Sequence, residues 1–237
     1  MSILVTGAAG GIGAAIVDQL VEQGHDVVAH DLRPTSTRSG VTPIVGDLLA
    51  DGFAGPLGDA LGDAPLEAVI AAHGVDGSGT IEDLDDAKVS RILQINTATV
   101  ARLYQSLCEL LERHGGTFVV IASQAGLYAE PKNAAYCASK SALVAWVKDT
   151  APRAATRGVA VRALCPGCTE TPLLLAAHER FAAAEGRDFH EVLDARRRSI
   201  PIGRFADVTE TAAAAVYLAA RDHRPSVLAV TGGEVLG

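Results

Sequence analysis

The sequence has few aromatic residues, 4% of 237, with one Met, one Trp and four Cys. It also has no long basic run: 20 Lys and Arg face 28 Asp and Glu, for a net charge of -8. A nucleic-acid-binding surface is therefore not expected, because such surfaces need clustered positive charge. No apolar run is long enough to cross a bilayer. Met1 leads directly into an apolar strand without a charged, cleavable leader. We expect a cytoplasmic protein that binds neither nucleic acid nor membrane.

The scarcity of cysteine also limits the chemistry. In a cytoplasmic protein the four Cys are expected to be free thiols. Cys165 and Cys168 form a C-x-x-C pair, which leaves a redox or metal role open. No second Cys pair or His pair accompanies it, so we predict no metal site. With 49% hydrophobic and 20% charged residues, the chain is expected to fold as one globular domain.

Short apolar runs alternate with helical patterns along the whole chain. Strands are predicted at 3–5, 26–31, 41–45, 66–72, 117–122, 159–164 and 227–230. Helices are predicted at 14–20, 53–61, 83–112, from about 133 onward and at 207–220. The segment 171–199 is mixed in polarity and suits a substrate lid. This alternation predicts an α/β fold, a Rossmann-like doubly wound parallel sheet of about seven strands with helices on both faces.

A glycine-rich turn follows the first strand. It reads Thr6-Gly-Ala-Ala-Gly-Gly-Ile-Gly13 and opens the first helix. Glycines let the backbone approach a pyrophosphate, and a helix N-terminus offers free N–H groups to it. Asp31 ends the second strand, 20 residues after Gly11. An acid there is placed to bind ribose hydroxyls and to repel a 2′-phosphate, which favours NAD over NADP. Arg33 and Arg38 are near enough to weaken that preference. A tight turn without a ligand, beside an exposed strand-end acid, is the alternative.

Three further residues point to proton transfer. Ser123 follows the strongly apolar run 117–122, at the strand end where open α/β sheets bind ligands. Tyr136 and Lys140 are four residues apart and so share one helix face. A nearby ammonium lowers the pKa of a phenol, which can then exchange a proton with an alcohol or a ketone. A Tyr-x-x-x-Lys pair also arises by chance, so its weight depends on the motifs upstream.

Taken together, these motifs resemble the short-chain dehydrogenase/reductase family over essentially the whole length, 1–237. The family's glycine motif matches Thr6 to Gly13, and its P-G-x-x-x-T motif matches Pro166, Gly167 and Thr171. Its catalytic residues match Asn96, Ser123, Tyr136 and Lys140. Its cofactor-binding positions match Gly7, Gly11, Ile12, Gly13, Asp31, Asp47, Leu48, Gly74, Tyr136, Lys140 and Thr171.

The resemblance implies a role for each matched residue. Tyr136 would be the acid/base, and Lys140 would lower its pKa and hold the nicotinamide ribose. Ser123 would bind the substrate oxygen, and Asn96 would fix a water behind Lys140. Thr171 would contact the nicotinamide carboxamide. Asp47 and Leu48 would lie at the adenine. The hydride would pass directly between substrate and cofactor, with no metal.

Two departures from the family stand out. The family often has Asn-Asn-Ala-Gly after the fourth strand, where this chain has Ala71-Ala72-His73-Gly74. For His73 we favour a packing or backbone role, with a catalytic role as the alternative. The chain also ends soon after Thr231-Gly-Gly, which puts a subunit contact there in doubt. The family is commonly dimeric or tetrameric through its two long helices, here about 83–112 and 134–156, so a homotetramer or homodimer is expected.

The resulting hypothesis is an NAD-dependent oxidoreductase that interconverts a secondary alcohol and a ketone. One alternative is an NADPH-dependent reductase of 3-oxoacyl thioesters, and another is a non-catalytic dinucleotide-binding sensor. Leu173, Leu174, Leu175 and Phe181 make the lid apolar, which favours a hydrophobic or cyclic substrate. Arg196 to Arg198 offer an acidic substrate as the alternative, unless they are a solvated helix face.

Overall fold

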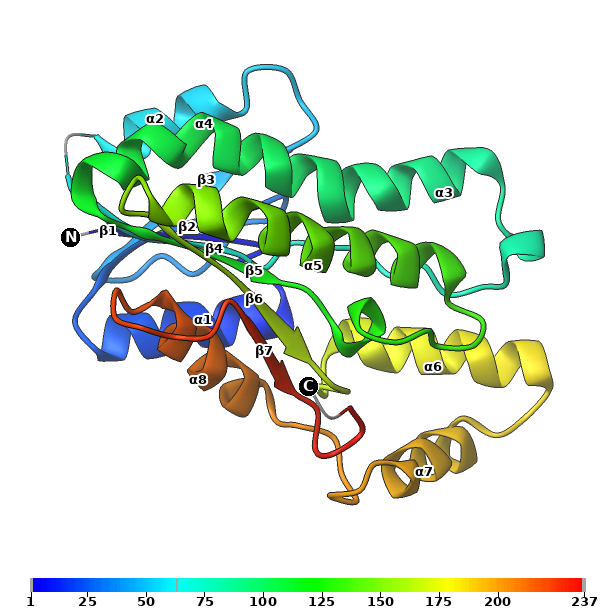
Figure 1. Ribbon diagram of the computed structural model, residues 1–237. Coiled ribbons are helices and arrows are strands. Elements are labelled where there is room, and N and C mark those ends of the chain that lie inside the picture. The colour runs from blue at the N-terminus through cyan, green and yellow to red at the C-terminus, as the bar shows by residue number, and fades with distance from the viewer. Residues whose placement is uncertain (1, 63, 236–237) are drawn as a thin grey trace.

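The structure is a computed structural model that describes residues 2–62 and 64–235. Its centre is a seven-stranded sheet in the order β3-β2-β1-β4-β5-β6-β7 (Figure 1). Every neighbouring pair of strands is parallel. The order reverses direction after β1, where the chain crosses from β3 to β4. Ligands of open parallel sheets bind at such a switch point, outside the carboxyl ends of the strands.

The strands are apolar because both faces of the sheet are covered. Val5, Val69, Ile70, Val119 and Leu164 are fully buried. The strand bounds are Ser2–Thr6 (β1), Asp26–Asp31 (β2), Val41–Val45 (β3), Leu66–Ala71 (β4), Thr117–Ile121 (β5), Ala160–Pro166 (β6) and Val227–Val230 (β7). The seven predicted strands are thus confirmed, with small differences at their ends.

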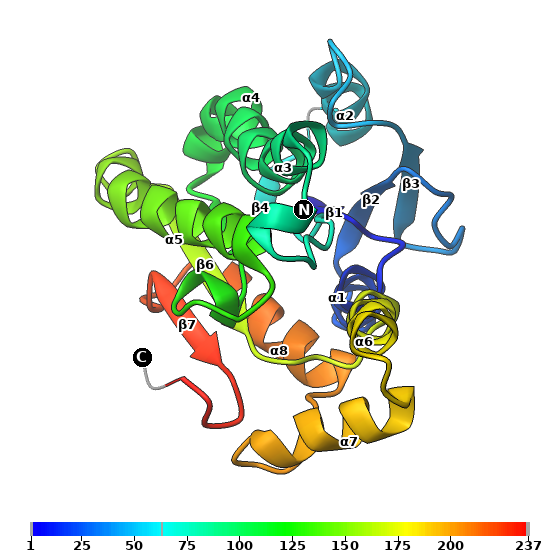
Figure 2. The same ribbon diagram turned by 90° about the vertical axis from the view of Figure 1, so that its right-hand side faces the viewer.

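Helices pack on both faces of the sheet, as predicted. One face carries α2 (Ala54–Leu61), α4 (Thr99–His114) and α5 (Ala134–Ala155), which share a core with β4, β5 and β6. The other carries α1 (Gly11–Glu22) and α8 (Val208–Ala219), which bury a second core against β1 and β5. Figure 2 looks onto the carboxyl edge of the sheet and shows these two layers above and below it.

The predicted helix 83–112 is not one regular helix. A short 3-10 turn at Ile81–Asp83 precedes α3 (Asp86–Leu93), and a π-helical turn at Gln94–Ala98 joins α3 to α4. The π turn widens the helix by one residue, a feature that often marks functional sites. Asn96 lies in this turn and is fully buried. Apolar spacing does not reveal the turn, because the inserted residue only shifts the register of the stripe.

The segment 171–199 forms two helices rather than a loop. Helix α6 spans Pro172–Glu185 and α7 spans Phe189–Ser199. Thr171 caps α6 by accepting a hydrogen bond from the Leu174 amide, and Pro172 takes the first helical position, which needs no amide hydrogen. Both helices lie beyond the carboxyl edge of the sheet (Figures 1 and 2). Among the described residues no helix is both long and apolar enough to span a bilayer.

Candidate functional site

A cavity of about 620 Å³ opens at the carboxyl edge of the sheet. Its walls come from the segments that follow β4, β5 and β6, from the first turns of α5 and from α6. Ser123, Tyr136, Lys140 and Thr171 all line it. The structure therefore brings together four residues that the sequence places up to 48 positions apart. The volume suits a small substrate beside one end of a cofactor.

Ser123 and Tyr136 face each other across this cavity. Ser123 follows β5 in an extended conformation, and its Oγ accepts a hydrogen bond from the Ala125 amide at 3.1 Å. Tyr136 lies in the first turn of α5, which begins at Ala134. The Ser123 hydroxyl hydrogen-bonds to the phenol and acts to lower the pKa of Tyr136. A substrate oxygen placed between them would contact two hydroxyl groups at once.

Burial outweighs that hydrogen bond and raises the pKa of Tyr136 above its ordinary value. Glu130 and Asp76 add to the rise because their negative charges disfavour a phenolate. The effect of Lys140 on this pKa stays a prediction. The Lys140 Nζ lies 5.5 Å from the centre of the Tyr136 ring. At that position the ammonium is over the ring rather than at its oxygen.

Lys140 is held from behind by the sheet. It is 4% exposed, and its Nζ donates a hydrogen bond to the Ile121 carbonyl at 3.0 Å. Burial lowers the pKa of Lys140 to about 8. A lysine with that pKa remains mostly protonated at pH 7. Because the pKa is close to neutral pH, a contact with a substrate or cofactor can change the protonation state of the amine.

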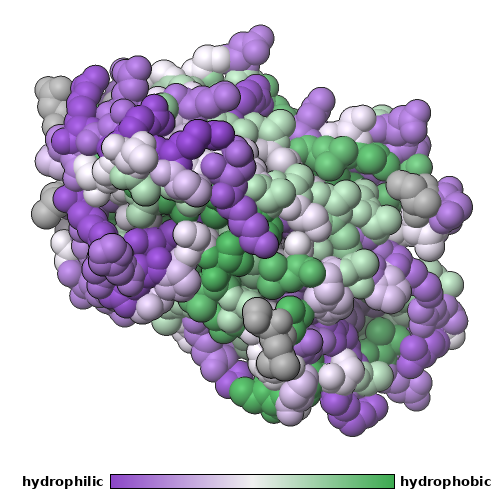
Figure 3. Space-filling model, viewed as in Figure 1, coloured by the Kyte–Doolittle hydropathy of each residue, from purple (hydrophilic) through white to green (hydrophobic). Residues whose placement is uncertain are grey.

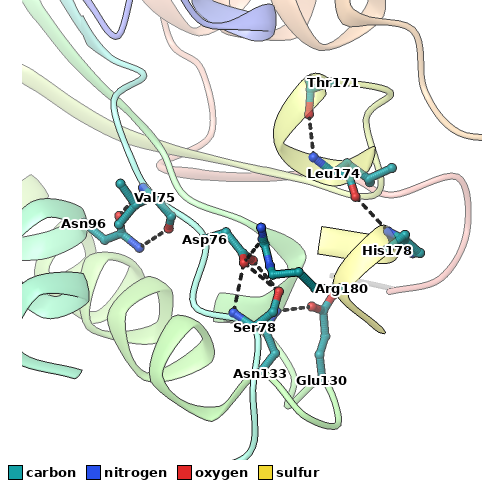
Figure 4. A network of polar contacts seen from close by, with 10 residues as sticks. All are labelled: Val75, Asp76, Ser78, Asn96, Glu130, Asn133, Thr171, Leu174, His178 and Arg180. Carbon is teal, nitrogen blue, oxygen red and sulfur yellow. Dashed lines mark hydrogen bonds and ion pairs between the residues drawn. The ribbon is translucent and has the colours of Figure 1, made fainter. Parts of the chain in front are cut away.

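Asn96 anchors the loop that follows β4. Its Oδ1 accepts the Val75 amide hydrogen at 2.8 Å, and its Nδ2 donates to the Val75 carbonyl and the Ser139 hydroxyl, each at 3.0 Å. Figure 4 shows the paired bonds between Asn96 and Val75. The partner that a buried Asn requires is therefore this loop and α5. Through Ser139 the side chain also contacts the turn that carries Lys140.

The glycine turn has the shape of a cradle. A Cβ on Gly13 would lie 2.0 Å from the Gly7 carbonyl oxygen, and one on Gly7 would lie 2.6 Å from the His73 amide nitrogen. Helix α1 begins after Gly10 with no side-chain cap and no acid in its first turn. Its N–H groups and its positive dipole end are thus free for an anionic group. A Cβ on Gly11 would lie 3.0 Å from Thr171 Cγ2. These observations fit the pyrophosphate of a dinucleotide.

The strand-end acid is tied to that turn. Asp31 Oδ2 accepts the Ala9 amide hydrogen at 3.0 Å, and Oδ1 accepts the Arg33 amide hydrogen at 3.0 Å. The Arg33 guanidinium folds back, donates to the Ala9 carbonyl at 2.9 Å and lies 3.7 Å from the same carboxylate. Arg38 pairs instead with Asp18. Asp31 is therefore held against the glycine turn with the Arg33 guanidinium beside it.

The other predicted cofactor residues surround the same edge. Asp47 is exposed, and its carboxylate accepts the Leu49 amide hydrogen at 2.8 Å, while Leu48 is buried beside it. Gly74 lines the cavity, and a Cβ there would lie 3.3 Å from Asn96 Oδ1. Thr171 accepts from the Leu174 amide, so its own hydroxyl hydrogen is free to donate into the cavity. Ile12 also lines the cavity.

His73 bridges two elements beneath the glycine turn. Its Nδ1 lies 2.7 Å from Thr6 Oγ1, and its Nε2 lies 2.8 Å from Thr99 Oγ1. Thr99 donates its own proton to the Ile95 carbonyl, so Nε2 carries the imidazole hydrogen and Nδ1 accepts from Thr6. Burial and the nearby Lys140 lower the pKa of His73 to about 3. These contacts fit the packing role, because both ring nitrogens are engaged by threonine hydroxyls.

Two other features flagged in the sequence are structural. Burial raises the pKa of Cys165 and of Cys168 to about 11, and both thiols are free. Within residues 2–62 and 64–235 no cluster of His, Cys, Asp or Glu could hold a metal. Arg196 is not a solvated side chain, because its guanidinium forms two hydrogen bonds with the Glu234 carboxylate. Its charge is therefore already paired with a carboxylate of the chain.

Sequence reasoning missed Glu130 and the ion pairs of α6. Glu130 lies between Ser123 and Tyr136 and lines the cavity. Arg180 on α6 pairs with Asp76 in the loop after β4, and Lys132 pairs with Glu185 at the end of α6 at 2.7 Å. Figure 4 shows Arg180 reaching across to Asp76, which also accepts hydrogen bonds from Ser78. The sequence does show an acid, Glu130, between Ser123 and Tyr136, and this could have been noticed. The ion pair between Asp76 and Arg180 joins residues 104 positions apart, so no local sequence pattern indicates it.

Comparisons with known proteins agree with this geometry. The family profile described as "Enoyl-(Acyl carrier protein) reductase" matches residues 7–235. The chain is 34% identical to 2-(S)-hydroxypropyl-CoM dehydrogenase 3 of Xanthobacter autotrophicus, over 91% of this chain and 88% of that protein. It is 35% identical to D-threitol dehydrogenase of Mycolicibacterium smegmatis, over 91% and 84%. A short chain dehydrogenase family protein from Francisella tularensis superposes with a TM-score of 0.88 at 24% identity, covering 98% of this chain and 97% of that one. The chain belongs to the short-chain dehydrogenase/reductase family of oxidoreductases.

Proposed function

We propose that this chain uses NAD to interconvert a secondary alcohol and a ketone by direct hydride transfer. The observation that carries the proposal is the meeting of Ser123, Tyr136 and Lys140 on one cavity beside the glycine turn. Residues 1–237 would form one dinucleotide-binding domain, with α6 and α7 as the substrate lid at about 172–200. The two relatives reported above are both named as dehydrogenases, which supports this direction of chemistry.

Each residue has a distinct task in the proposed reaction. The hydride chemistry is that of the nicotinamide dinucleotide. During oxidation, Tyr136 takes the proton of the substrate hydroxyl, and during reduction it returns a proton to the ketone oxygen. Ser123 donates to that oxygen and fixes its position. Lys140 holds the ribose next to the phenol, and its positive charge offsets the effect of burial on the Tyr136 pKa. Asn96 keeps the loop 74–76 in place.

The decisive test is alcohol-dependent NADH formation with the Tyr136→Phe variant. A phenyl ring fills the same space but cannot transfer a proton, so kcat should fall by about 10²- to 10⁴-fold. Tyr217→Phe is the matched control, because Tyr217 is 43% exposed on α8 and stacks on Arg224. NADH binding, followed by fluorescence, should be similar in all three proteins. Turnover that persists in Tyr136→Phe would refute the assignment of the acid/base.

NAD as the preferred cofactor is also a proposal, supported by Asp31. The carboxylate at the strand end would repel a 2′-phosphate, and Arg33 beside it reduces that repulsion. Wild type should bind NADH at least about tenfold more tightly than NADPH, a difference of ~1.4 kcal/mol. Asp31→Ser should remove the preference, and Arg33→Ala should increase it. Arg38→Ala is the control, because Arg38 pairs with Asp18. Equal titrations of both cofactors with wild type would contradict the proposal.

A second candidate is a reductase of 3-oxoacyl thioesters that uses NADPH. A Vibrio cholerae protein named 3-oxoacyl-[acyl-carrier-protein] reductase, to which the chain is 28% identical over 97% of its length, favours it. Acetoacetyl-CoA with NADPH tests it directly, because a thioester reductase should consume NADPH with this substrate. A non-catalytic sensor would instead bind NADH and turn over neither an alcohol nor a thioester.

We also propose that the protein assembles as a homotetramer or homodimer through α4 and α5. On α5, Ala138, Ser141 and Ala145 are exposed and small, so a second helix could approach closely. The edge strand β7 is only half buried, and Figure 3 shows hydrophobic surface over it. Edge strands of this kind are commonly covered by a neighbour.

A further inference from the structure

The cavity contains several charged residues, and nearly all of them are paired. Asp76 pairs with Arg180, Glu185 pairs with Lys132 and Arg187, and Arg196 pairs with Glu234. Glu130 also lines the cavity. Within the part of the chain that the structure describes, it forms no ion pair. Apart from the buried Lys140, the charged group of the cavity wall that lacks an ion pair among the described residues is therefore the Glu130 carboxylate.

Two amide groups hold this carboxylate in place. Gln124 Nε2 donates to Glu130 Oε1 at 3.1 Å, and Asn133 Nδ2 donates to Oε2 at 3.1 Å. Gln124 is 1% exposed and Asn133 is 8% exposed, so both amides hold Glu130 from the buried side. Since a carboxylate only accepts, both amide nitrogens must face it, which fixes their orientation. Figure 4 shows Asn133 and Glu130 below Asp76 and Ser78.

Around Glu130, hydrogen-bond acceptors outnumber the donors that the protein supplies to them. Gln124 Nε2 also donates to the Tyr128 hydroxyl at 3.0 Å, so both of its hydrogens are used. Each Glu130 oxygen accepts one amide hydrogen and retains capacity for another. Tyr128 keeps its own hydroxyl hydrogen. A ligand that suits this wall therefore donates hydrogen bonds toward Glu130 and can accept one from Tyr128, which is the pattern of hydroxyl groups.

The position of Glu130 relates this wall to the reacting carbon. It lies on the segment between β5 and α5, seven residues after Ser123 and six before Tyr136. All three residues line the same cavity. A substrate whose reacting oxygen contacts Ser123 and Tyr136 thus places its neighbouring atoms near Glu130.

We propose that Glu130, held by Gln124 and Asn133, binds a second hydroxyl group of the substrate, and that the substrate is a neutral polyhydroxy alcohol or the matching hydroxyketone. The inference rests on the proposed function and names its substrate class. The apolar side chains of the proposed lid, Leu173, Leu174 and Phe181, also line the cavity and would cover the carbon chain.

The same feature disfavours three other substrate classes. A carboxylate or phosphate would meet the negative charge of Glu130, while the cavity's guanidinium groups are paired. A plain alcohol or an acyl thioester offers no second hydroxyl group, so the remaining acceptor capacity of the partly buried Glu130 carboxylate would lose its contact with water and gain no donor from the substrate. An amino alcohol could pair with Glu130 as a cation, so it is the competing ligand that the experiment must include.

Glu130 also acts on Tyr136 through its charge. The groups facing the phenol are Ser123, which lowers its pKa by a hydrogen bond, and Glu130, Asp76 and Cys137, which raise it. Lys140 lies over the ring. Replacing Glu130 with Gln removes one negative charge and lowers the pKa of Tyr136. Since oxidation needs the phenolate, the acid limb of the rate should then move to lower pH.

A series of four-carbon alcohols tests the inference: 2-butanol, 2,3-butanediol, threitol, tartrate and 1-amino-2-butanol, each with NAD. In wild type, kcat/KM should rise about 10- to 100-fold from 2-butanol to threitol, because a hydrogen bond to a charged group contributes that much. Tartrate should be a poor substrate, and kcat/KM should be higher for threitol than for 1-amino-2-butanol.

Glu130→Gln should raise KM for threitol by about tenfold or more while leaving KM for 2-butanol nearly unchanged. Its acid limb should move to lower pH with both substrates. Glu179→Gln, an exposed position on α6, controls for the loss of one charge and should match wild type.

Three outcomes overturn the inference. If 2-butanol and threitol are oxidised equally well, and both depend on Tyr136, the proposed function stands and the polyol inference is wrong. If 1-amino-2-butanol is preferred, Glu130 binds an amine instead. If no alcohol is oxidised although NADH binds, the proposed function fails and the inference fails with it.

Discussion

At the scale of single residues, His73 shows how an unusual side chain is accommodated. The histidine occupies a position where a small residue is more common in the family, and its two nitrogens bridge Thr6 on β1 and Thr99 at the start of α4. The sequence marked this residue as a departure from the pattern. Its partners lie 67 and 26 positions away, so the bridge itself could not be predicted from the sequence.

The lowered pKa of His73 predicts a specific response to acid. The folded protein keeps the imidazole neutral down to a pKa of about 3, whereas the unfolded chain protonates it near pH ~6.5. Between these values the unfolded state binds more protons, so stability falls as the pH falls. Below about pH 3 the loss should level off.

Denaturant unfolding of His73→Gln, which cannot titrate, measures this contribution. From pH 6.5 to 4.5, wild type should lose up to ~1.4 kcal/mol per pH unit more than the variant. Gln can also bridge the two threonines, so the comparison isolates the titration. The exposed His223→Gln is the control and should follow wild type. Parallel slopes for wild type and His73→Gln would show that the imidazole is not kept neutral.

At the scale of elements, ion pairs connect the proposed lid to both sides of the cavity. Helix α6 is linked to the loop after β4 by Arg180 and Asp76, and to the start of α5 by Lys132 and Glu185. Lys132 has a positive φ of 57°, which costs a non-glycine residue energy and suggests that its position matters. Exposed ion pairs contribute only about 0.2–1 kcal/mol each, so these two can limit lid opening without determining whether the domain folds.

The double variant Arg180→Met, Lys132→Met should open the lid more often. Each lost pair should make limited proteolysis within 172–199 about two- to fivefold faster. The free energy of unfolding of the double variant should change by less than ~2 kcal/mol. In wild type, added salt should accelerate cleavage because it screens exposed charges. The variant should lose that dependence.

Arg153→Met is the matched control, because Arg153 pairs with Asp149 on α5, away from the lid. Identical cleavage rates in wild type and the double variant would show that the ion pairs do not hold α6.

Elements differed in how far the sequence predicted them. The buried strands were clear because runs such as 117–121 are continuously apolar. The π turn at Gln94–Ala98 was missed because it only shifts the register of the apolar stripe that runs along α3 and α4. The helices α6 and α7 were missed because their polar and apolar residues are mixed. What stabilises the lid is a cap at Thr171 and long-range ion pairs, and neither depends on apolar periodicity.

At the scale of the whole molecule, the alternation of strands and helices predicted the fold, and the motifs predicted the candidate site. The residues proposed to recognise the substrate could not be predicted from the sequence. Ser123, Tyr136 and Lys140 were found because the strand end and the helix spacing place them together. Glu130 was not, because its importance depends on Gln124 and Asn133 holding both carboxylate oxygens. A carboxylate in a loop has no pattern of its own in the sequence. Glu130 stands out only in the structure, where the other charged side chains of the cavity, apart from Lys140, form ion pairs.

The proposed assembly through α5 predicts that a substitution at the exposed position Ala145 changes the number of chains per particle in solution. Ala145→Arg places a long charged side chain on the exposed face of α5 and should reduce a particle of two or four 24.4 kDa chains to a smaller one. Sedimentation velocity measures this change. Gln23→Arg, at the end of α1, adds the same charge elsewhere and should not alter the mass. A wild-type protein that sediments as a single chain would contradict the proposal.

The ion pair between Arg196 and Glu234 has a practical consequence for handling the protein. Arg196 lies on α7, whose neighbour α6 covers the cavity, while Glu234 lies within a few residues of the C-terminal end. A tag or fusion partner placed next to Glu234 would therefore disturb α7, which is part of the proposed lid. Such a fusion should lower turnover while leaving the free energy of unfolding nearly unchanged.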